Sequence, residues 1–270
     1  MNERETKREN ENAVRAPAVA GTFYPASQTE LAATVDRLLA SVNVAPGAPC
    51  PKALIVPHAG YIYSGAIAAS AFARVQPYAD RITRVVLVGP AHRVFVDGLV
   101  SPGASRMRTP LGEVTIDEAA LREIGVAANP AAHAREHSLE VELPFLQRVT
   151  PHAQLVPLTG TRAKPELVGE ALEKLWGGPE TLIVISSDLS HYLPYAEGRE
   201  LDEQTCSSIL AKQAVEGERA CGSIGINGLL WVARRKQLRI ELVDLRSSGD
   251  TAGSRDEVVG YAAFACYEVE

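Results

Sequence analysis

Residues 84–92 read R-V-V-L-V-G-P-A-H, a run of large aliphatic side chains that leads into glycine, proline and a histidine. A continuous apolar run, without alternation of apolar and polar residues, predicts a strand buried on both faces. Comparable runs lie at 53–56, 154–158, 182–185 and 238–245, and segments of helical period stand between or beside them. The sequence therefore predicts an α/β fold with a mostly parallel central sheet and helices on both faces.

The remaining elements complete a single domain. Helical patterns cover residues 30–42, 64–75, 138–149, 165–176, 201–215 and 224–236. A last apolar run at 258–269 indicates one further strand, antiparallel and at an edge of the sheet. Since the chain contains no internal repeat and no low-complexity linker, we expect one domain over residues 15–270. Residues 1–14, which are rich in charge and nearly free of apolar side chains, are expected to form a disordered tail.

The composition excludes several partners and compartments. The 270 residues include 27 basic and 33 acidic side chains, a net charge of −6, so there is no electrostatic reason to bind nucleic acid or an anionic membrane. The uncharged stretch 53–73 is interrupted by Pro57 and Gly60 and is not apolar enough for a membrane helix. The four cysteines form no C-x-x-C pair, which argues against a zinc ribbon or a disulfide framework and favours a reducing, cytoplasmic setting.

Polar side chains follow four of the predicted strands. His58 and His92 come soon after the runs at 53–56 and 84–88, Asp188 and His191 follow 182–185, and Asp250 follows 238–245. In open parallel sheets the ligand crevice lies beyond the carboxyl ends of the strands, so these residues can converge although they are far apart in the sequence.

Each of these residues alone is more often structural, because such histidines commonly form loop hydrogen bonds and Asp188 or Asp250 suits an N-cap or a turn. Together they suit a metal ion. Two imidazoles and one carboxylate form the facial triad of non-haem Fe(II) oxygenases, and His58, His92 and Asp250 can supply that set. His191 would then remain free as a proton acceptor, because the unperturbed pKa of imidazole is ~6.5.

Two further residues have both a functional and a structural interpretation. Ser138 can cap the helix predicted at 138–149 and so direct His137 into the same crevice, but a helix-end histidine balanced by Glu136 and Glu140 is an equal alternative. Cys221 precedes a helix whose amino end can lower a thiol pKa, although a small buried residue is the favoured interpretation. Serine-hydrolase and nucleotide-binding motifs are absent from the sequence.

Six motifs in order resemble those of the Memo family, whose bacterial and archaeal members are also called AmmeMemoRadiSam system protein B. They are R-A-P-A-V-A-G-T-F-Y at 15–24, P-H-A-G-Y-I-Y-S-G at 57–65, G-P-A-H at 89–92, E-H-S-L-E-V-E-L-P-F at 136–145, S-S-D-L-S-H-Y at 186–192 and S-G-D at 248–250. The resemblance extends from about residue 15 to the C-terminus and implies a fold similar to that of class III extradiol ring-cleaving dioxygenases.

The resemblance also implies roles for individual residues. His58 and His92 match the two iron-binding histidines of those dioxygenases, and His191 matches the base that accepts a substrate proton. Animal members of the family have a cysteine at the third ligand position, where this chain has Asp250, a harder donor that suits Fe(II) better than copper. Asp188 matches a pocket residue that is expected to orient His191 or a metal-bound water.

Three functions are compatible with these residues. The first is a metal-dependent oxidoreductase, similar to a dioxygenase, in which Fe(II) or another divalent ion acts on a small chelating substrate of unknown identity. The second is a non-catalytic protein that uses the same pocket to bind a metal or ligand, and the third is metal-assisted hydrolysis. The name of the bacterial group implies association with an AMMECR-type protein and a radical SAM protein.

Overall fold

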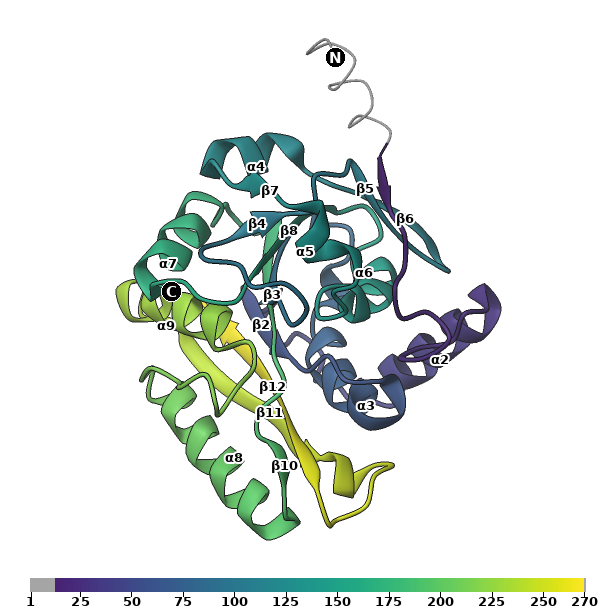
Figure 1. Cartoon of the computed structure of the whole chain (residues 1–270), viewed down its shortest axis with the longest axis vertical. Helices are drawn as coiled ribbons and strands as arrows, with labels where there is room; N and C mark the ends of the chain where they lie inside the picture. Colours follow the sequence, from purple (N-terminus) through teal and green to yellow (C-terminus); the bar gives the residue numbers. More distant parts are fainter. Residues whose placement is uncertain (1–12, 270) are drawn as a thin grey trace.

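The computed structural model describes residues 13–269, which form one α/β domain around a nine-stranded mixed sheet (Figure 1). Its centre consists of four parallel strands in the order β2 (Ala53–Val56), β9 (Thr181–Ser186), β3 (Arg84–Pro90) and β8 (Gln154–Gly160). These are four of the five apolar runs of the sequence analysis, and nearly every residue in them is buried. The prediction of a parallel, doubly covered sheet is confirmed for this central part.

The outer strands make the sheet mixed rather than mostly parallel. On one side, β12 (Val258–Tyr267) pairs antiparallel with β2, and both β11 (Arg239–Ser247) and β10 (His191–Leu193) pair antiparallel with β12. On the other side, β4 (Val100–Ser101) pairs antiparallel with β8, and β7 (Ala127–Ala128) runs parallel to β4. The last predicted strand is therefore antiparallel as expected, but it lies inside the sheet and not at its edge.

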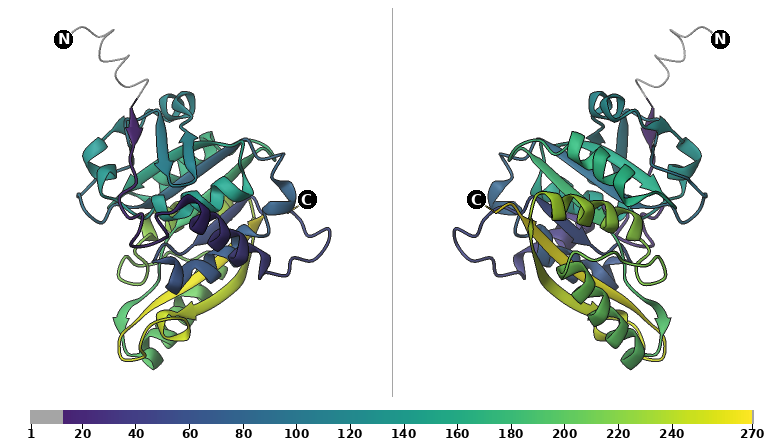
Figure 2. Two further views of the ribbon diagram at one scale, coloured as in Figure 1. Left: turned by 90° about the vertical axis from the view of Figure 1, so that its right-hand side faces the viewer. Right: turned by 90° about the vertical axis from the view of Figure 1, so that its left-hand side faces the viewer.

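Helices cover both faces of the sheet. The strands contact α3 (Tyr61–Phe72) on one face, where α2 (Gln28–Ala40) and α6 (Leu143–Val149) pack beside it. The other face carries α7 (Pro165–Lys174), α8 (Tyr195–Leu210) and α9 (Ser223–Arg235). Figure 2 shows α2 and α3 in front of the sheet in one view and α8 and α9 in front of it in the opposite view.

Helix packing follows from the spacing of apolar and small residues. Leu31, Val35 and Leu39 recur every fourth residue along α2 and are at most 3% exposed, so they form one stripe against the core. Between α7 and α9 the backbones approach closely, because a Cβ on Gly228 would lie 2.3 Å from the side chain of Val168. Within the described residues, no helix is both long and apolar enough to cross a membrane.

A small second sheet holds the N-terminal segment. It comprises β1 (Val14–Arg15), β5 (Arg106–Thr109) and β6 (Gly112–Thr115). The predicted tail of residues 1–14 falls outside the described residues, except for its last two residues, of which Val14 pairs with Arg106. The remaining short elements are α4 (Glu118–Ile124), α5 (Pro130–Ala134) and the 3-10 turns η1 (Gln76–Tyr78), η2 (Glu140–Glu142) and η3 (Ser248–Asp250).

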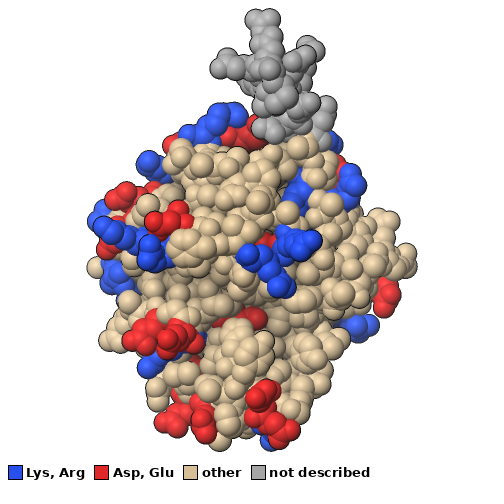
Figure 3. Space-filling view, in the orientation of Figure 1, with Lys and Arg blue, Asp and Glu red and all other residues tan. Residues whose placement is uncertain are grey.

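Charged side chains of both signs are interspersed on the face drawn in Figure 3. Acidic side chains gather toward the end of the molecule that holds α8, whose exposed residues include Glu197, Glu200 and Glu203. This distribution agrees with the net charge of −6. The prediction that the protein binds no nucleic acid remains untested.

Candidate metal centre

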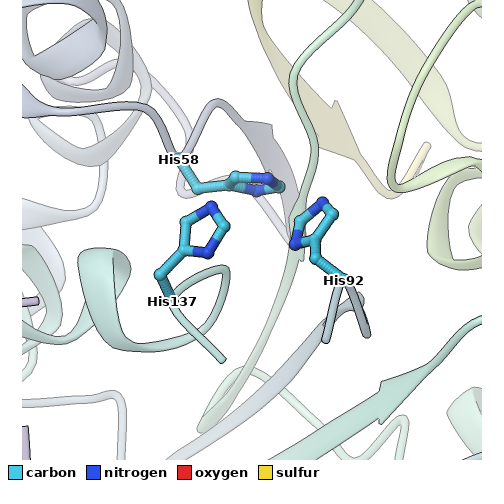
Figure 4. Close-up of side chains that lie close together, drawn as sticks. All are labelled: His58, His92 and His137. Atoms are coloured by element: carbon cyan, nitrogen blue, oxygen red, sulfur yellow. The ribbon is translucent and has the colours of Figure 1, made fainter. Parts of the chain in front are cut away.

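Three histidines meet beyond the carboxyl ends of the central strands. His58 and His92 are each the second residue after a strand, β2 and β3 respectively, and His137 lies between α5 and η2. One nitrogen from each ring lies within 4.8 Å of the other two. The ring centroids are 4.8 to 5.4 Å apart, and Figure 4 shows the three rings facing a common space.

In each ring, the Nδ1 atom lies close to an oxygen atom of a neighbouring side chain. His92 Nδ1 lies 2.9 Å from Glu136 Oε1, and His137 Nδ1 lies 3.3 Å from the same oxygen. His58 Nδ1 lies 2.7 Å from the hydroxyl oxygen of Ser186, Oγ. A carboxylate can only accept, so the contact with Glu136 places a proton on Nδ1 of His92 and leaves its Nε2 lone pair for a ligand. The contacts of His137 and His58 suit the same tautomer.

Glu136 fixes the two histidines that it touches. Its carboxylate also accepts hydrogen bonds from the backbone amides of His92 (2.5 Å), His137 (2.8 Å) and Ser138 (2.9 Å). Burial acts to raise the pKa of Glu136, but these hydrogen bonds and the nearby imidazole of His92 hold it well below its usual range. Glu136 therefore remains an ionised acceptor at the centre of the site.

The three histidines fit a first-row metal ion. Burial lowers the pKa of His58 well below 6.5 and that of His137 to about 4, so both rings are neutral at pH 7. Two imidazole nitrogens at ~2.0 to 2.1 Å from one ion are at most ~4.2 Å apart. Since the three nitrogens already lie within 4.8 Å of one another, side-chain adjustments of less than about 1 Å bring them onto an ion.

Asp250 does not belong to this group. Its third member is His137, and not the carboxylate that the sequence analysis expected. The Asp250 carboxylate accepts from the Tyr195 hydroxyl at 2.6 Å and from the Ser247 amide at 2.9 Å. It also closes the η3 turn in a capping box with Ser247. The structure therefore gives Asp250 the turn-forming role that was its structural alternative.

Asp188 and His191 both lie near the histidines. Asp188 is the second residue after β9, and its Oδ1 accepts from the His58 amide at 2.8 Å. Burial raises the pKa of Asp188 to about 7. Its hydrogen bond holds the loop of His58. The expected role of Asp188 in orienting His191 or a metal-bound water stays a prediction.

His191 has one ring nitrogen available. Its Nδ1 lies 2.9 Å from the Leu189 carbonyl, which can only accept, so Nδ1 carries the proton and Nε2 carries the lone pair. Burial is the largest cause that lowers the pKa of His191, and the nearby His92 acts in the same direction. The ring is therefore neutral at pH 7 and able to accept a proton.

Cys221 also contacts the group, although not as a reactive thiol. Its Sγ lies 3.4 Å from His58 Nε2. Burial, followed by the charge of Asp188, raises the pKa of Cys221 far above its ordinary value, which outweighs any effect of the α9 amino end. The thiol is therefore neutral, and its weak contact with His58 Nε2 is one that an ion on that nitrogen would replace.

Sequence reasoning missed the residues that support the histidines. Ser138 does not cap a helix, because α6 begins only at Leu143, and its hydroxyl donates to the Pro90 carbonyl at 2.8 Å. Ser186 and Glu136 contact the ligand rings, and the Phe23 ring lies 4.8 Å from that of His137. The only sequence signal for Glu136 was its position next to His137.

Glu136→Gln tests this support. An amide cannot accept from two imidazoles and three backbone amides as a carboxylate does, so the rings of His92 and His137 lose their common anchor. We expect metal affinity to fall ~10- to 100-fold, the usual cost of losing a partner of a metal-binding histidine. Competitive titration with a chromophoric chelator measures the change, and an affinity equal to that of the parent protein would contradict it.

Comparisons with known proteins relate the chain to one family. The family model described as "Memo-like protein" matches residues 15–265. The "MEMO1 family protein" of Aquifex aeolicus is 38% identical over 270 residues, covering 92% of this chain and 97% of the relative. That of Archaeoglobus fulgidus is 35% identical over 266 residues (92% and 98%), and that of Caldivirga maquilingensis is 32% identical over 287 residues (94% and 99%).

Proposed function

The chain belongs to the Memo family, and we propose that it is a metal-dependent oxidoreductase that holds a divalent ion on His58, His92 and His137. The observation that carries the proposal is the convergence of three imidazoles, with one nitrogen of each ring within 4.8 Å of the other two and an oxygen beside each Nδ1. Neutral imidazole suits Fe, Cu, Zn and Ni, and three nitrogens on one face of an octahedral ion leave three positions open.

Fe(II) is the ion that we propose first. The family resemblance supports it through the likeness to iron-dependent dioxygenases, and imidazole ligands suit iron as well as zinc, copper and nickel. When bound, the ion supplies redox chemistry and a binding site for a chelating substrate. Dioxygen oxidises Fe(II), so metal content is to be measured after anaerobic purification.

His191 is proposed as the general base. Its Nε2 lone pair can accept the proton of a substrate hydroxyl, while its Nδ1–H donates to Leu189 and keeps the ring oriented. Asp188 positions the His58 loop through a buried hydrogen bond.

His191→Ala separates catalysis from metal binding. The variant is expected to keep its iron, because His191 lies outside the three-histidine group, and to lose ~10²- to 10⁴-fold in turnover, the contribution of a positioned general base. Iron analysis and oxygen uptake with catechol as the probe measure the two properties. Loss of iron in this variant would contradict the assignment of His191.

Oxygen uptake by the parent protein decides between the enzyme and its alternatives. Iron binding without uptake for any of a panel of catechols would favour a non-catalytic binding protein, or hydrolysis by a metal-activated water. We also propose a cytoplasmic location, since all four cysteines are free, and association with the AMMECR-type and radical SAM proteins that the family name implies.

A further inference from the structure

A buried carboxyl group lies two hydrogen-bond contacts away from His58. Glu142 is 0% exposed, and its Oε1 lies 2.9 Å from Ser186 Oγ. The same Ser186 oxygen lies 2.7 Å from the Ser138 carbonyl and 2.7 Å from His58 Nδ1. Glu142 Oε2 has no hydrogen-bond partner among the described residues. Ser186 thus joins Glu142 to a proposed metal ligand.

The protons of this network can be counted. Ser186 carries one hydroxyl proton, and the Ser138 carbonyl, which can only accept, is paired only if it receives that proton. The two lone pairs of Ser186 then require two donors. His58 Nδ1–H is one, and the other contact is Glu142 Oε1, which can donate only when the carboxyl is protonated.

We propose that Glu142 is a positioning residue that stays protonated and, through Ser186, keeps His58 in the tautomer with Nε2 free for the metal. A protonated Glu142 directs the Ser186 hydroxyl toward Ser138, so Ser186 can only accept from His58. An ionised Glu142 would draw the Ser186 proton to itself and leave the Ser138 carbonyl unpaired. The inference rests on the proposed metal site for its functional consequence, and on the network alone for the protonation state.

Two observations support a neutral Glu142. The unpartnered Oε2 costs much less as the carbonyl oxygen of an acid than as part of a buried carboxylate. Burial raises the pKa of Glu142 well above its usual value, and the nearby charge of Asp188 acts in the same direction, against the smaller effect of the Ser186 hydrogen bond.

The first experiment detects the proton itself. Infrared difference spectra of the metal-free protein at pH 8 should show a carboxylic-acid C=O band that disappears in Glu142→Gln. At that pH the buried Asp188 and Asp202, whose pKa values are raised by burial to about 7 and about 6, are mostly ionised. Absence of the band would overturn the proposal, whether or not the protein binds a metal.

The second experiment tests the positioning role. Glu142→Gln keeps a donor toward Ser186 and should leave Co(II) affinity within about threefold of the parent, whereas Glu142→Met has no donor and should lose ~10- to 100-fold. Equal loss in both variants, with unchanged melting temperatures, would contradict the role of the donated hydrogen bond.

A third measurement reports the tautomer of His58 directly. Nitrogen-15 spectra of metal-free protein should show His58 protonated at Nδ1 in the parent and in Glu142→Gln, and a shift toward the Nε2–H form in Glu142→Met. A parent with Nε2–H would overturn the proposal. If the parent shows the infrared band and the Nδ1–H form but binds no Co(II), the proposed function fails while the assignment of Glu142 stands.

Discussion

Replacing His58, His92 or His137 by alanine is expected to reduce metal affinity by more than about 100-fold in each case. Removing one imidazole leaves two protein ligands, and even the loss of a residue that only supports such a ligand costs ~10- to 100-fold. Iron content after anaerobic purification and the affinity for Co(II) measure the effect. The His137 variant is the most informative, because the sequence alone favoured Asp250 as the third ligand.

Two variants control this result. His152→Gln removes an exposed histidine outside the group, and Asp250→Asn removes the carboxylate that the structure places in a turn. Both are expected to keep the metal content of the parent. If Asp250→Asn lost the metal while His137→Ala retained it, the three-histidine assignment would be wrong and the facial triad of the sequence analysis would be favoured.

Glu140→Ala is expected to destabilise the fold by ~3 to 5 kcal/mol, the cost of leaving a buried charge without its partner. Glu140 and its ion-pair partner Arg15 are both buried. The Glu140 carboxylate also accepts from the amides of Ala18 (2.7 Å) and Val19 (2.9 Å) and from the Tyr24 hydroxyl (2.5 Å). This one side chain therefore fastens residues 15–24 to the loop that carries His137.

Urea unfolding measures the effect on the free energy of unfolding. The matched control is Glu203→Ala, which breaks an exposed ion pair with Arg199 and should cost at most ~1 kcal/mol. Equal destabilisation by the two substitutions would contradict the importance of the buried pair. Because Phe23 lies against the His137 ring, Glu140→Ala is also expected to weaken metal binding.

The central sheet could be predicted from the sequence because the residue pattern of its strands fits only burial on both faces. Aliphatic runs without polar residues, such as 85–88, need cover on both faces, and that requirement predicts a parallel sheet between helices. The short strands β4, β7 and β10 were not predicted. Each contains two or three residues, and they form by pairing with strands distant in the sequence, so no local pattern marks them.

Site residues could be predicted from the sequence where they follow directly after a central strand. His58, His92 and Asp188 are each the second residue after a central strand, and register between strands brings such positions together. His137 and Asp250 lie on connections whose path is set by side-chain contacts. The loop of His137 is held by Glu136, and Asp250 is held by Tyr195 and Ser247. Sequence spacing carries no information on such contacts.

The most direct test of the three-histidine site is a crystal structure of anaerobically iron-loaded protein, with anomalous diffraction measured at the iron absorption edge. We expect one strong anomalous peak at ~2.0 to 2.2 Å from the Nε2 atoms of His58, His92 and His137. A peak bound instead by the carboxylate of Asp250, or none at these histidines in fully loaded crystals, would contradict the account.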